Sequence, residues 1–262
     1  MLWSVNDVAG YRIDATDGEV GSVVDFFFDD RTSAIRYVVV DTGSWLPGRE
    51  VLLVPGALRH AGEGSRAFST ALSKAQVKES PDVATEKPVS RQQEEMLHAH
   101  YGWQPYWAYG PEMAALAPYW GAAGYATPLY EARQTSETEA EAQRAAEAQI
   151  GEGDPDLRSA REVIGYYIGA TDGDIGHVED LLVDDEAWRI RYLVIDTRNW
   201  LPGRKVVVSP QWIHSIDWVR ETVDLDQTRD QIRNSPEYDA STPPDRAFEE
   251  RLHQHFARPG YW

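Results

Sequence analysis

The sequence predicts a mainly β protein made of two small antiparallel β-barrels, each followed by short helices. Three observations lead to this prediction. The chain repeats itself at a distance of about 155 residues, the repeated part alternates β-branched and aromatic residues with polar ones, and turn residues separate these runs. Because 42% of the 262 residues are hydrophobic, the chain can fill one large core or two small ones.

The repeat extends over about 100 residues, as duplicated domains commonly do. Residues 10–55 align with residues 165–210 without a gap, and more than half of the aligned positions are identical. The same offset aligns EEMLHAH, residues 94–100, with EERLHQH, residues 249–255. It also aligns Tyr106-Trp107 with Tyr261-Trp262. We therefore expect two modules, residues 1–107 and 156–262, joined by residues 108–155.

The strands follow from local pattern. Asp-Gly pairs at Asp17 and Asp172 are suited to tight hairpin turns, which need positive φ. In the run AIRYVVVDT, residues at every second position are apolar, as in a half-buried strand. We expect five or six short strands per module, which in the first module are about Tyr11 to Ala15, Val20 to Asp29, Ile35 to Asp41, Glu50 to Val54 and Ala67 to Thr70.

Differences between the two copies indicate which side chains are buried. Four aligned pairs exchange one apolar residue for another, as core positions do: Val20/Ile175, Val38/Leu193, Val40/Ile195 and Leu52/Val207. Four other pairs change polarity or charge, which a packed core would not accept: Val24/Glu179, Ser22/His177, Arg31/Glu186 and Glu50/Lys205. The first set is expected in the core and the second set at the surface.

Helix signals follow the strands in each copy. Ser73 with Gln76, and Thr228 with Gln231, have the spacing of a capping box. Ser90 with Gln93 begins a second helix, and Asp245 is the equivalent cap in the second copy. Each module therefore consists of a β core and a helical arm.

These runs together resemble the PRC-barrel domain. In the second copy the resemblance is carried by residues 157–166, then ATDGDIGHVEDLLVDDE, IRYLVIDT, WLPGRKVVVSP and IRNSPEYD, and the first copy carries matching runs. The family is named for the H subunit of the photosynthetic reaction centre and is shared with a ribosome maturation factor. The resemblance implies a six-stranded antiparallel barrel that serves as a binding or scaffolding module, with no known catalytic residues. The chain lacks the membrane-spanning helix of the H subunit and any separate RNA-linked domain.

The loop WLPGR occurs in both copies and admits two interpretations. Pro47 and Gly48 are suited to a type II turn. In the structural interpretation the loop tryptophans cover the barrel end, and Asp41 pairs with Arg49 as Asp196 pairs with Arg204. In the functional interpretation tryptophan and arginine form a docking patch, since both are favoured at interfaces. The candidate interaction residues are Trp45, Arg49, Trp200, Arg204, Trp103 and Trp107.

A second candidate site is a metal-ligand pattern in the helical arms. Glu95-x-x-His98 recurs as Glu250-x-x-His253. Residues three or four apart share a helix face, so Glu95 with His98, or Glu94 with His98, could together bind a metal. The alternative is that these histidines complement the dipole at the end of the helix. We expect no cofactor, and we name Glu95, His98, Glu250 and His253 as weak metal candidates.

The segment between the modules has its own composition. Residues 101–130 are rich in tryptophan and tyrosine, and Glu112 is their only charged residue. An exposed segment of this kind would form a large apolar patch, so we expect it against a barrel, a partner or a membrane surface. Residues 136–149 are rich in alanine and charge, which is typical of a solvated helical spacer.

Charge and composition limit the function. A net charge of −18 argues against general binding to nucleic acid or anionic membranes, and the lack of cysteine suits a reducing compartment. No phosphate-binding glycine motif, GxSxG motif or repeated Ser-His-acid set is present. We expect a cytoplasmic, non-enzymatic binding or scaffold protein that associates with proteins and self-associates through its barrels. The alternatives are a peripheral component of a membrane or photosynthetic complex, and a ribosome- or RNA-associated factor.

Overall fold

A computed structural model describes residues 1–62, 64–81, 89–109, 156–197 and 204–262, and the statements below concern these residues. They are mainly β, as the sequence predicted. The first repeat contains β1 (Leu2–Ser4), α1 (Val5–Val8), β2 (Arg12–Ala15), β3 (Gly18–Asp29), β4 (Ile35–Asp41), β5 (Glu50–Leu53), β6 (Leu58–His60), β7 (Ala67–Thr70), α2 (Lys74–Lys78) and α3 (Arg91–Tyr101). The second contains β8 (Leu157–Ser159), α6 (Ala160–Val163), β9 (Tyr167–Ala170), β10 (Gly173–Asp184), β11 (Arg189–Asp196), β12 (Lys205–Val208), β13 (Ile213–Asp217), β14 (Thr222–Leu225), α7 (Arg229–Arg233) and α8 (Arg246–His255).

The two repeats form two sheets with the same strand order. One sheet runs β5-β4-β3-β2-β7-β6, and the other runs β12-β11-β10-β9-β14-β13. The partners in β2 to β5 and in β9 to β12 agree at the repeat offset, so Ile13 pairs with Gly21 just as Ile168 pairs with Gly176. The last hairpins differ, because β13 and β14 have a register shift that β6 and β7 lack. The duplication seen in the sequence is therefore a duplication of strand register.

The expectation of closed antiparallel barrels is only partly correct. Each sheet is mixed, because β7 runs parallel to β2 and β14 runs parallel to β9. Within the described residues no pairing joins β5 to β6 or β12 to β13, so neither sheet closes into a barrel. The hairpins are antiparallel, as their turns predicted. The parallel pairs join strands that no hairpin turn connects: β7 follows β6 in an antiparallel hairpin and then lies beside β2, which is four strands earlier than β6 in the chain.

Each sheet also takes one strand from the other repeat. Both central strands, β3 and β10, have 12 residues, whereas the hairpin partners β2 and β9 have 4. The part of β10 that β9 leaves unpaired is covered by β1, with Leu2 opposite Asp184 and Ser4 opposite Leu182. In the other sheet β8 covers the same part of β3.

The compact units of the chain therefore differ from its sequence repeats. One unit comprises Met1–Val8 with Ala160–Trp262, and the other comprises Ala9–Ser159. The chain thus leaves the first unit after eight residues, builds the second unit, and then returns.

The local signals read from the sequence are confirmed. Gly18 (φ 133°), Gly173 (φ 138°) and Gly48 (φ 74°) adopt positive φ in their turns. Ser73, Ser90 and Thr228 each form a capping box, and Asp245 caps α8 by accepting a hydrogen bond from the Phe248 amide at 2.7 Å. The sequence analysis missed the short strands β1, β6, β8 and β13, because runs this short show little periodicity.

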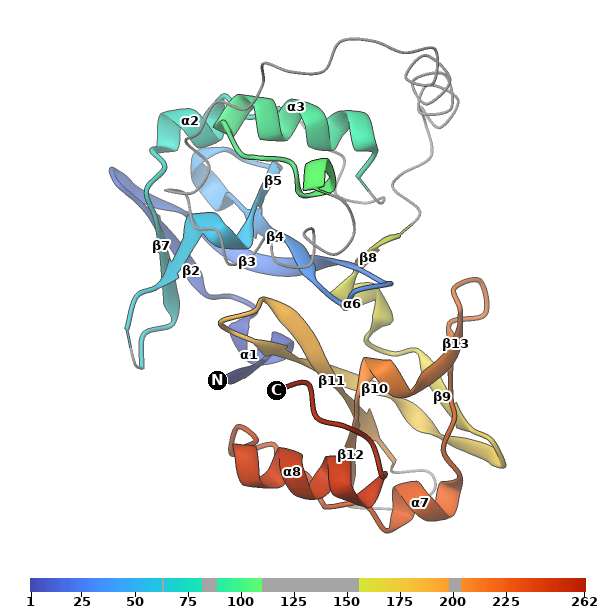
Figure 1. Cartoon of the computed structure of the whole chain (residues 1–262). Helices are drawn as coiled ribbons and strands as arrows, with labels where there is room; N and C mark the ends of the chain where they lie inside the picture. The colour runs from blue at the N-terminus through green and yellow to red at the C-terminus, as the bar shows by residue number, and fades with distance from the viewer. Residues whose placement is uncertain (63, 82–88, 110–155, 198–203) are drawn as a thin grey trace, which may run out of the picture. The chain divides into compact units, whose positions relative to one another are not determined.

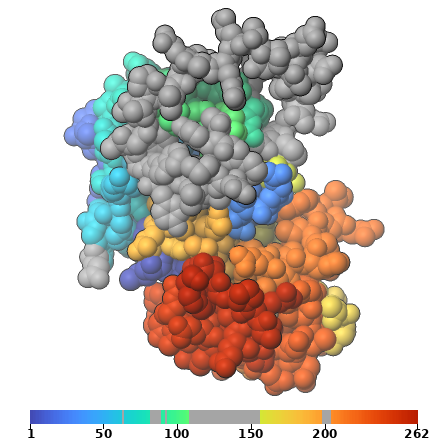
Figure 2. Space-filling model, in the orientation of Figure 1, coloured from blue at the N-terminus to red at the C-terminus, as the bar shows by residue number. Residues whose placement is uncertain are grey.

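The core consists of the residues that the two copies exchange conservatively. All eight members of the apolar pairs, such as Val38/Leu193 and Leu52/Val207, are buried. All members of the polarity-changing pairs are exposed or only partly buried, as expected. The helical arm of each repeat packs on its sheet: Figure 1 shows α3 over the face of β4 and β5, and Figure 2 shows α8 with the C-terminal residues, in red, covering one face of their unit.

Gly21 is required by a close backbone approach. A Cβ atom at this position would overlap the carbonyl oxygen of Asp41, and one at Gly176 would overlap that of Asp196. We expect Gly21→Ala to lower the free energy of unfolding by about 3 kcal/mol, measured by urea denaturation, because the sheet has to open to admit the methyl group.

Gly43→Ala is the matched control for this substitution. Gly43 also has positive φ (61°), but nothing lies within 4 Å of its Cβ position, so only backbone strain of about 1 kcal/mol is expected. Equal losses in the two variants would show that the close approach is not the cause.

Candidate functional site

Each repeat buries a tyrosine in its sheet, and a polar cluster is built around it. Tyr37 lies on β4 and Tyr192 on β11, and both are 0% exposed. A buried phenol needs a hydrogen-bond partner. For Tyr37 the helical arm supplies two, because Glu94 and His98 lie one turn apart on α3 and face the sheet. The Tyr37 oxygen is 2.8 Å from Glu94 Oε1 and 3.0 Å from His98 Nε2.

Two further groups approach the Glu94 carboxylate: Tyr106, from the chain that turns back after α3, and Arg91, the first residue of α3. The Tyr106 hydroxyl donates to Glu94 Oε1 at 2.9 Å, and Arg91 Nη1 lies 3.0 Å from Glu94 Oε2. Glu94 is 0% exposed, so these donors replace the water that its carboxylate loses on burial. We call Tyr37, Glu94, His98, Tyr106 and Arg91 the first Tyr–Glu–His cluster.

The second repeat contains the same cluster, which we call the second Tyr–Glu–His cluster: Tyr192, Glu249, His253, Tyr261 and Arg246. The Tyr192 oxygen lies 3.1 Å from both Glu249 Oε1 and His253 Nε2. Tyr261 donates to the same carboxylate oxygen, and Arg246 Nη1 is 3.2 Å from Glu249 Oε2. In each repeat, five residues from the sheet, the arm helix and the chain that follows it thus come together with the same geometry.

An arginine on β4 or β11 holds the second tyrosine of each cluster. The Arg36 guanidinium lies 4.1 Å from the ring centroid of Tyr106, and Arg191 lies 3.8 Å from that of Tyr261. Arg36 Nη2 is 2.9 Å from Asp29 Oδ2. Burial alone would raise the pKa of Asp29, but its hydrogen bond and charge interaction with Arg36 hold that pKa below its ordinary value. The Arg36 side chain therefore makes a cation–π contact with Tyr106 and an ion pair with Asp29 at the same time.

Tryptophan rings pack on each histidine: Trp107 lies 5.0 Å from His98, and the aligned Trp262 lies 5.2 Å from His253, measured between ring centroids. A second tryptophan in each repeat comes from a different sequence position. Trp103 lies 5.9 Å from His98 in the first repeat, and Trp212 lies 5.1 Å from His253 in the second, measured between ring centroids. At the offset of the repeat, Trp103 aligns with Arg258 and Trp212 aligns with Ala57. The two repeats therefore share one indole beside the imidazole and supply a second indole from different positions.

The clusters keep their side chains in defined protonation states. Burial raises the pKa of Tyr37 and Tyr192, and the adjacent carboxylates Glu94 and Glu249 raise it further. Burial lowers the pKa of His98 to about 4 and also lowers that of His253. At neutral pH the phenols are therefore protonated donors and the imidazoles are neutral. Such an arrangement is suited to holding the helical arm against the sheet.

The predicted metal pattern divides between two faces of the helix. Glu95 and Glu250 are exposed, whereas His98 and His253 point inward to the clusters. The carboxylates next to the histidines are instead Glu94 and Glu249. In the part of the chain that the structure describes, no group of three or more His, Asp or Glu side chains could hold a metal ion.

The loop arginines connect the turn to the end of the first arm helix. Arg49 donates to the carbonyl oxygen of Lys78 at 2.7 Å and to that of Ser80. Arg204 donates to the carbonyl oxygen of Arg233 at 2.6 Å and to that of Ser235. Carbonyls at a helix end have no partner within the helix, so the guanidinium groups satisfy them. The expected pairing of Asp41 with Arg49 is not found, because Arg49 is used at the helix end.

The predicted interaction tryptophans have separate surroundings. Trp45 is half-buried; its indole N–H donates to the Val20 carbonyl oxygen, and Lys74 Nζ lies 4.5 Å from its ring centroid. Trp103 stacks on Tyr101 at 4.2 Å, and Trp107 lies under Arg91 at 4.3 Å. Trp200 and the segment from residue 110 to 155 lie outside the described residues.

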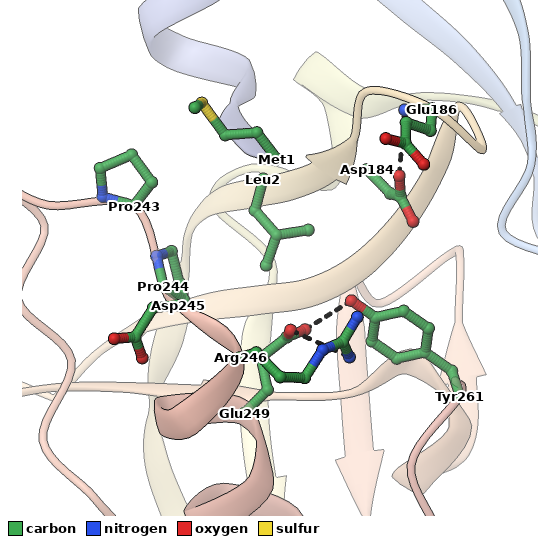
Figure 3. Close-up of a pocket in the computed structure, with 10 residues that line it drawn as sticks. All are labelled: Met1, Leu2, Asp184, Glu186, Pro243, Pro244, Asp245, Arg246, Glu249 and Tyr261. Carbon is green, nitrogen blue, oxygen red and sulfur yellow. Dashed lines mark hydrogen bonds and ion pairs between the residues drawn. The ribbon is translucent and has the colours of Figure 1, made fainter.

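Two cavities adjoin these groups. The first, of about 550 Å³, lies over the second Tyr–Glu–His cluster, and Figure 3 shows Arg246, Glu249 and Tyr261 at one wall and Met1 and Leu2 at another. The exchanged strand β1 thus forms part of this cavity. The second, of about 300 Å³, is lined by residues that include Gly21, Asp41, Trp45 and Lys74.

Comparison with known proteins identifies part of the chain. The family model of the PRC-barrel domain matches residues 155–232, which include every strand of the second repeat but not α8 or its tail. No curated protein matches the chain. None of the helices in the described residues has both the length and the apolar character needed to cross a bilayer.

Sequence reasoning missed most members of the clusters, although the signal was present. Tyr37, Arg36, Asp29, Arg91 and Glu94 are identical to their counterparts in the second repeat. Identity between the copies could have selected these buried polar residues. Burial could not be read from the sequence, because glutamates at adjacent positions of a helix look alike until one face is known to be covered.

Glu94→Ala should destabilise the protein much more than Glu95→Ala. Removing Glu94 leaves Arg91 and two buried phenols without their acceptor, which costs about 3 kcal/mol of unfolding free energy in urea titrations. Glu95 is exposed, and its removal should change stability by less than about 0.5 kcal/mol. The same contrast is expected between Glu249→Ala and Glu250→Ala. Similar losses within a pair would contradict the cluster's role.

His98 should make stability depend on pH below neutrality. Its folded pKa of about 4 lies below the ordinary histidine value of 6.5, so the unfolded chain binds more protons between these two pH values. Stability from the neutral imidazole is complete above pH 6.5 and is lost as pH falls towards 4, by about 3 kcal/mol in total.

Urea titrations from pH 7 to pH 4 would measure this loss. His98→Asn should lose less stability on acidification than the wild type, and His100→Asn, at an exposed position, serves as the control. Parallel curves for the wild type and His98→Asn would rule out His98 as the source.

Proposed function

We propose that the chain is a non-enzymatic scaffold built from two PRC-barrel modules, which brings other proteins together. The match at residues 155–232 supports the assignment of the second module. The first repeat has the same strand order and register, which supports extending the assignment to it.

The observation that carries the proposal is how the two repeats differ. Residues that hold the module together, such as those of the Tyr–Glu–His clusters, are identical in both repeats. The exposed positions differ: Tyr167 (69% exposed) aligns with Arg12, Met96 (51%) with Arg251, and Val219 (93%) with Gly64. Two modules with the same interior and different exposed residues are suited to binding two different partners.

Within this proposal the loop tryptophans, which both repeats share, anchor the partners, and the exposed residues that differ between the repeats distinguish one partner from the other. Arg49 and Arg204 are occupied at helix ends, so Trp45 and Trp200 are the members of the predicted patch to test. The net charge of −18 favours protein partners over RNA or anionic membranes.

Trp45→Ala/Trp200→Ala should lower recovery of bound proteins, measured by affinity purification with chemical cross-linking, by about tenfold. His214→Ala, at an exposed position outside the loops and outside these diverging positions, is the control and should keep the partners of both modules. Arg49→Ala is unsuitable because it would loosen α2.

The same purification separates this proposal from its alternatives. Nuclease treatment should leave the recovered proteins unchanged, and the chain should not float with anionic vesicles. Recovery of ribosomal RNA, or flotation that needs residues 101–130, would favour an RNA-associated or membrane-peripheral role instead. Unchanged recovery with the double tryptophan variant would remove the loops as the docking surface.

A further inference from the structure

The two repeats exchange one strand in each direction, and both exchanges have the same register. Asp29 lies opposite Leu157 and Phe27 opposite Ser159, as Asp184 lies opposite Leu2 and Leu182 opposite Ser4. The ladders are extended by the same outer hydrogen bond, from the Asp30 amide to the Asp156 carbonyl at 2.8 Å and from the Asp185 amide to the Met1 carbonyl at 3.0 Å. We call β1 and β8 the donor strands.

Each donor strand fills a site that its acceptor sheet cannot fill by itself. On one edge β10 pairs with β11 along residues 177–184, and on the other β9 reaches only residues 173–177. Residues 182–184 would otherwise expose unpaired amides and carbonyls, which attract strands from other chains. Leu2 and Leu157 are buried at 5% and 2% exposure, so the donor also closes the core.

A serine and an aspartate lock each donor in place. Ser4 Oγ donates to Asp180 Oδ2, and Ser159 Oγ donates to Asp25 Oδ2 at 2.5 Å. Both aspartates lie at a register shift of the long strand, where the backbone bulges. Asn6 adds two hydrogen bonds. Its backbone N–H donates to Asp180 Oδ1 at 3.2 Å, and its side-chain Nδ2 donates to the Glu179 carbonyl oxygen at 3.0 Å.

The middle residue of each donor strand, Trp3 in β1 and Arg158 in β8, differs between the two donors. Trp3 of β1 packs edge-on against Trp188 at 5.6 Å between ring centroids, and Ser33 occupies the aligned position in the first repeat. Arg158 of β8 lies 3.3 Å from Asp30 Oδ2. Asp30 aligns with Asp185, so the Arg158 contact could form on either sheet, whereas the Trp3 contact is specific to the second repeat. The Trp3–Trp188 contact therefore favours pairing of β1 with β10 over pairing of β1 with β3.

We propose that the same exchange also forms between two copies of the chain, with the first repeat of one copy joined to the second repeat of the other. Such a dimer contains every strand pair and every Ser–Asp contact described above, so its free energy differs from that of the single chain only through the connecting residues and the association entropy. Protein concentration then decides between the two forms. This inference does not require the scaffold function.

The absence of natural cysteine permits a direct test in the full chain. Two singly substituted chains that differ in tag size, Ser4→Cys and Asp180→Cys, are mixed, unfolded in urea and refolded together over a range of concentrations under mild oxidation. A disulfide between them forms only if residue 4 of one chain reaches residue 180 of the other. We expect this product to rise with concentration to about ten times that of the control mixture.

The control mixture combines Ser4→Cys with Val219→Cys, whose thiol is at a 93% exposed position and reports random collision. A second mixture, Ser159→Cys with Asp25→Cys, should give the interchain disulfide in parallel, because the proposed exchange is reciprocal. Circular dichroism of each single variant checks that it refolds.

Two results would overturn the proposal. One is an interchain product no greater than the control at every concentration, while a Ser4→Cys/Asp180→Cys double variant forms its disulfide within one chain. The other is cross-linking of residues 4 and 180 without cross-linking of residues 25 and 159, which would mean that the exchange between chains is not reciprocal.

Discussion

The length of the central strands is the constraint on which the rest of the structure depends. Strands β3 and β10 each have 12 residues, three times as many as the hairpin partners that precede them. A strand edge inside a protein must be paired, because unpaired amides and carbonyls lose their water on burial. The fold meets this requirement by donating β1 to β10 and β8 to β3. The two repeats are consequently interdependent: each sheet is complete only with a strand from the other.

The Tyr–Glu–His clusters fix the helical arms by a different principle. A buried carboxylate is costly unless several donors surround it, and Glu94 and Glu249 each receive two phenols and an arginine. The donors come from the sheet, the arm helix and the tail that returns after it, so the cluster forms only when all three are in place. The polar geometry is the same in both repeats, and so is one tryptophan beside each histidine, whereas the second tryptophan comes from a different position. This polar arrangement is therefore more constrained than part of the apolar packing next to it.

These internal constraints leave the surfaces free to diverge. The shared arginines of the WLPGR loops satisfy helix-end carbonyls, and the shared aspartates Asp29 and Asp184 hold the arginines beneath the tail tyrosines. Exposed residues, in contrast, change between the copies from charged to aromatic or apolar. This division between a common interior and different exteriors underlies the proposal of a scaffold.

The sequence by itself determined the duplication, the mainly β composition, the strand positions near the hairpins and the helix caps, because these depend on residues close together in the chain. Comparison of the two copies placed Val38 and Val40 in the core, and capping boxes located the starts of α2 and α7. Only the tertiary structure decided which repeat each short strand joins, that the sheets are mixed and open, and that Glu94, not Glu95, faces His98. These features depend on contacts between residues far apart in the chain: three-residue strands such as β1 carry almost no local signal, and the inward face of a helix is defined by the sheet against which it packs.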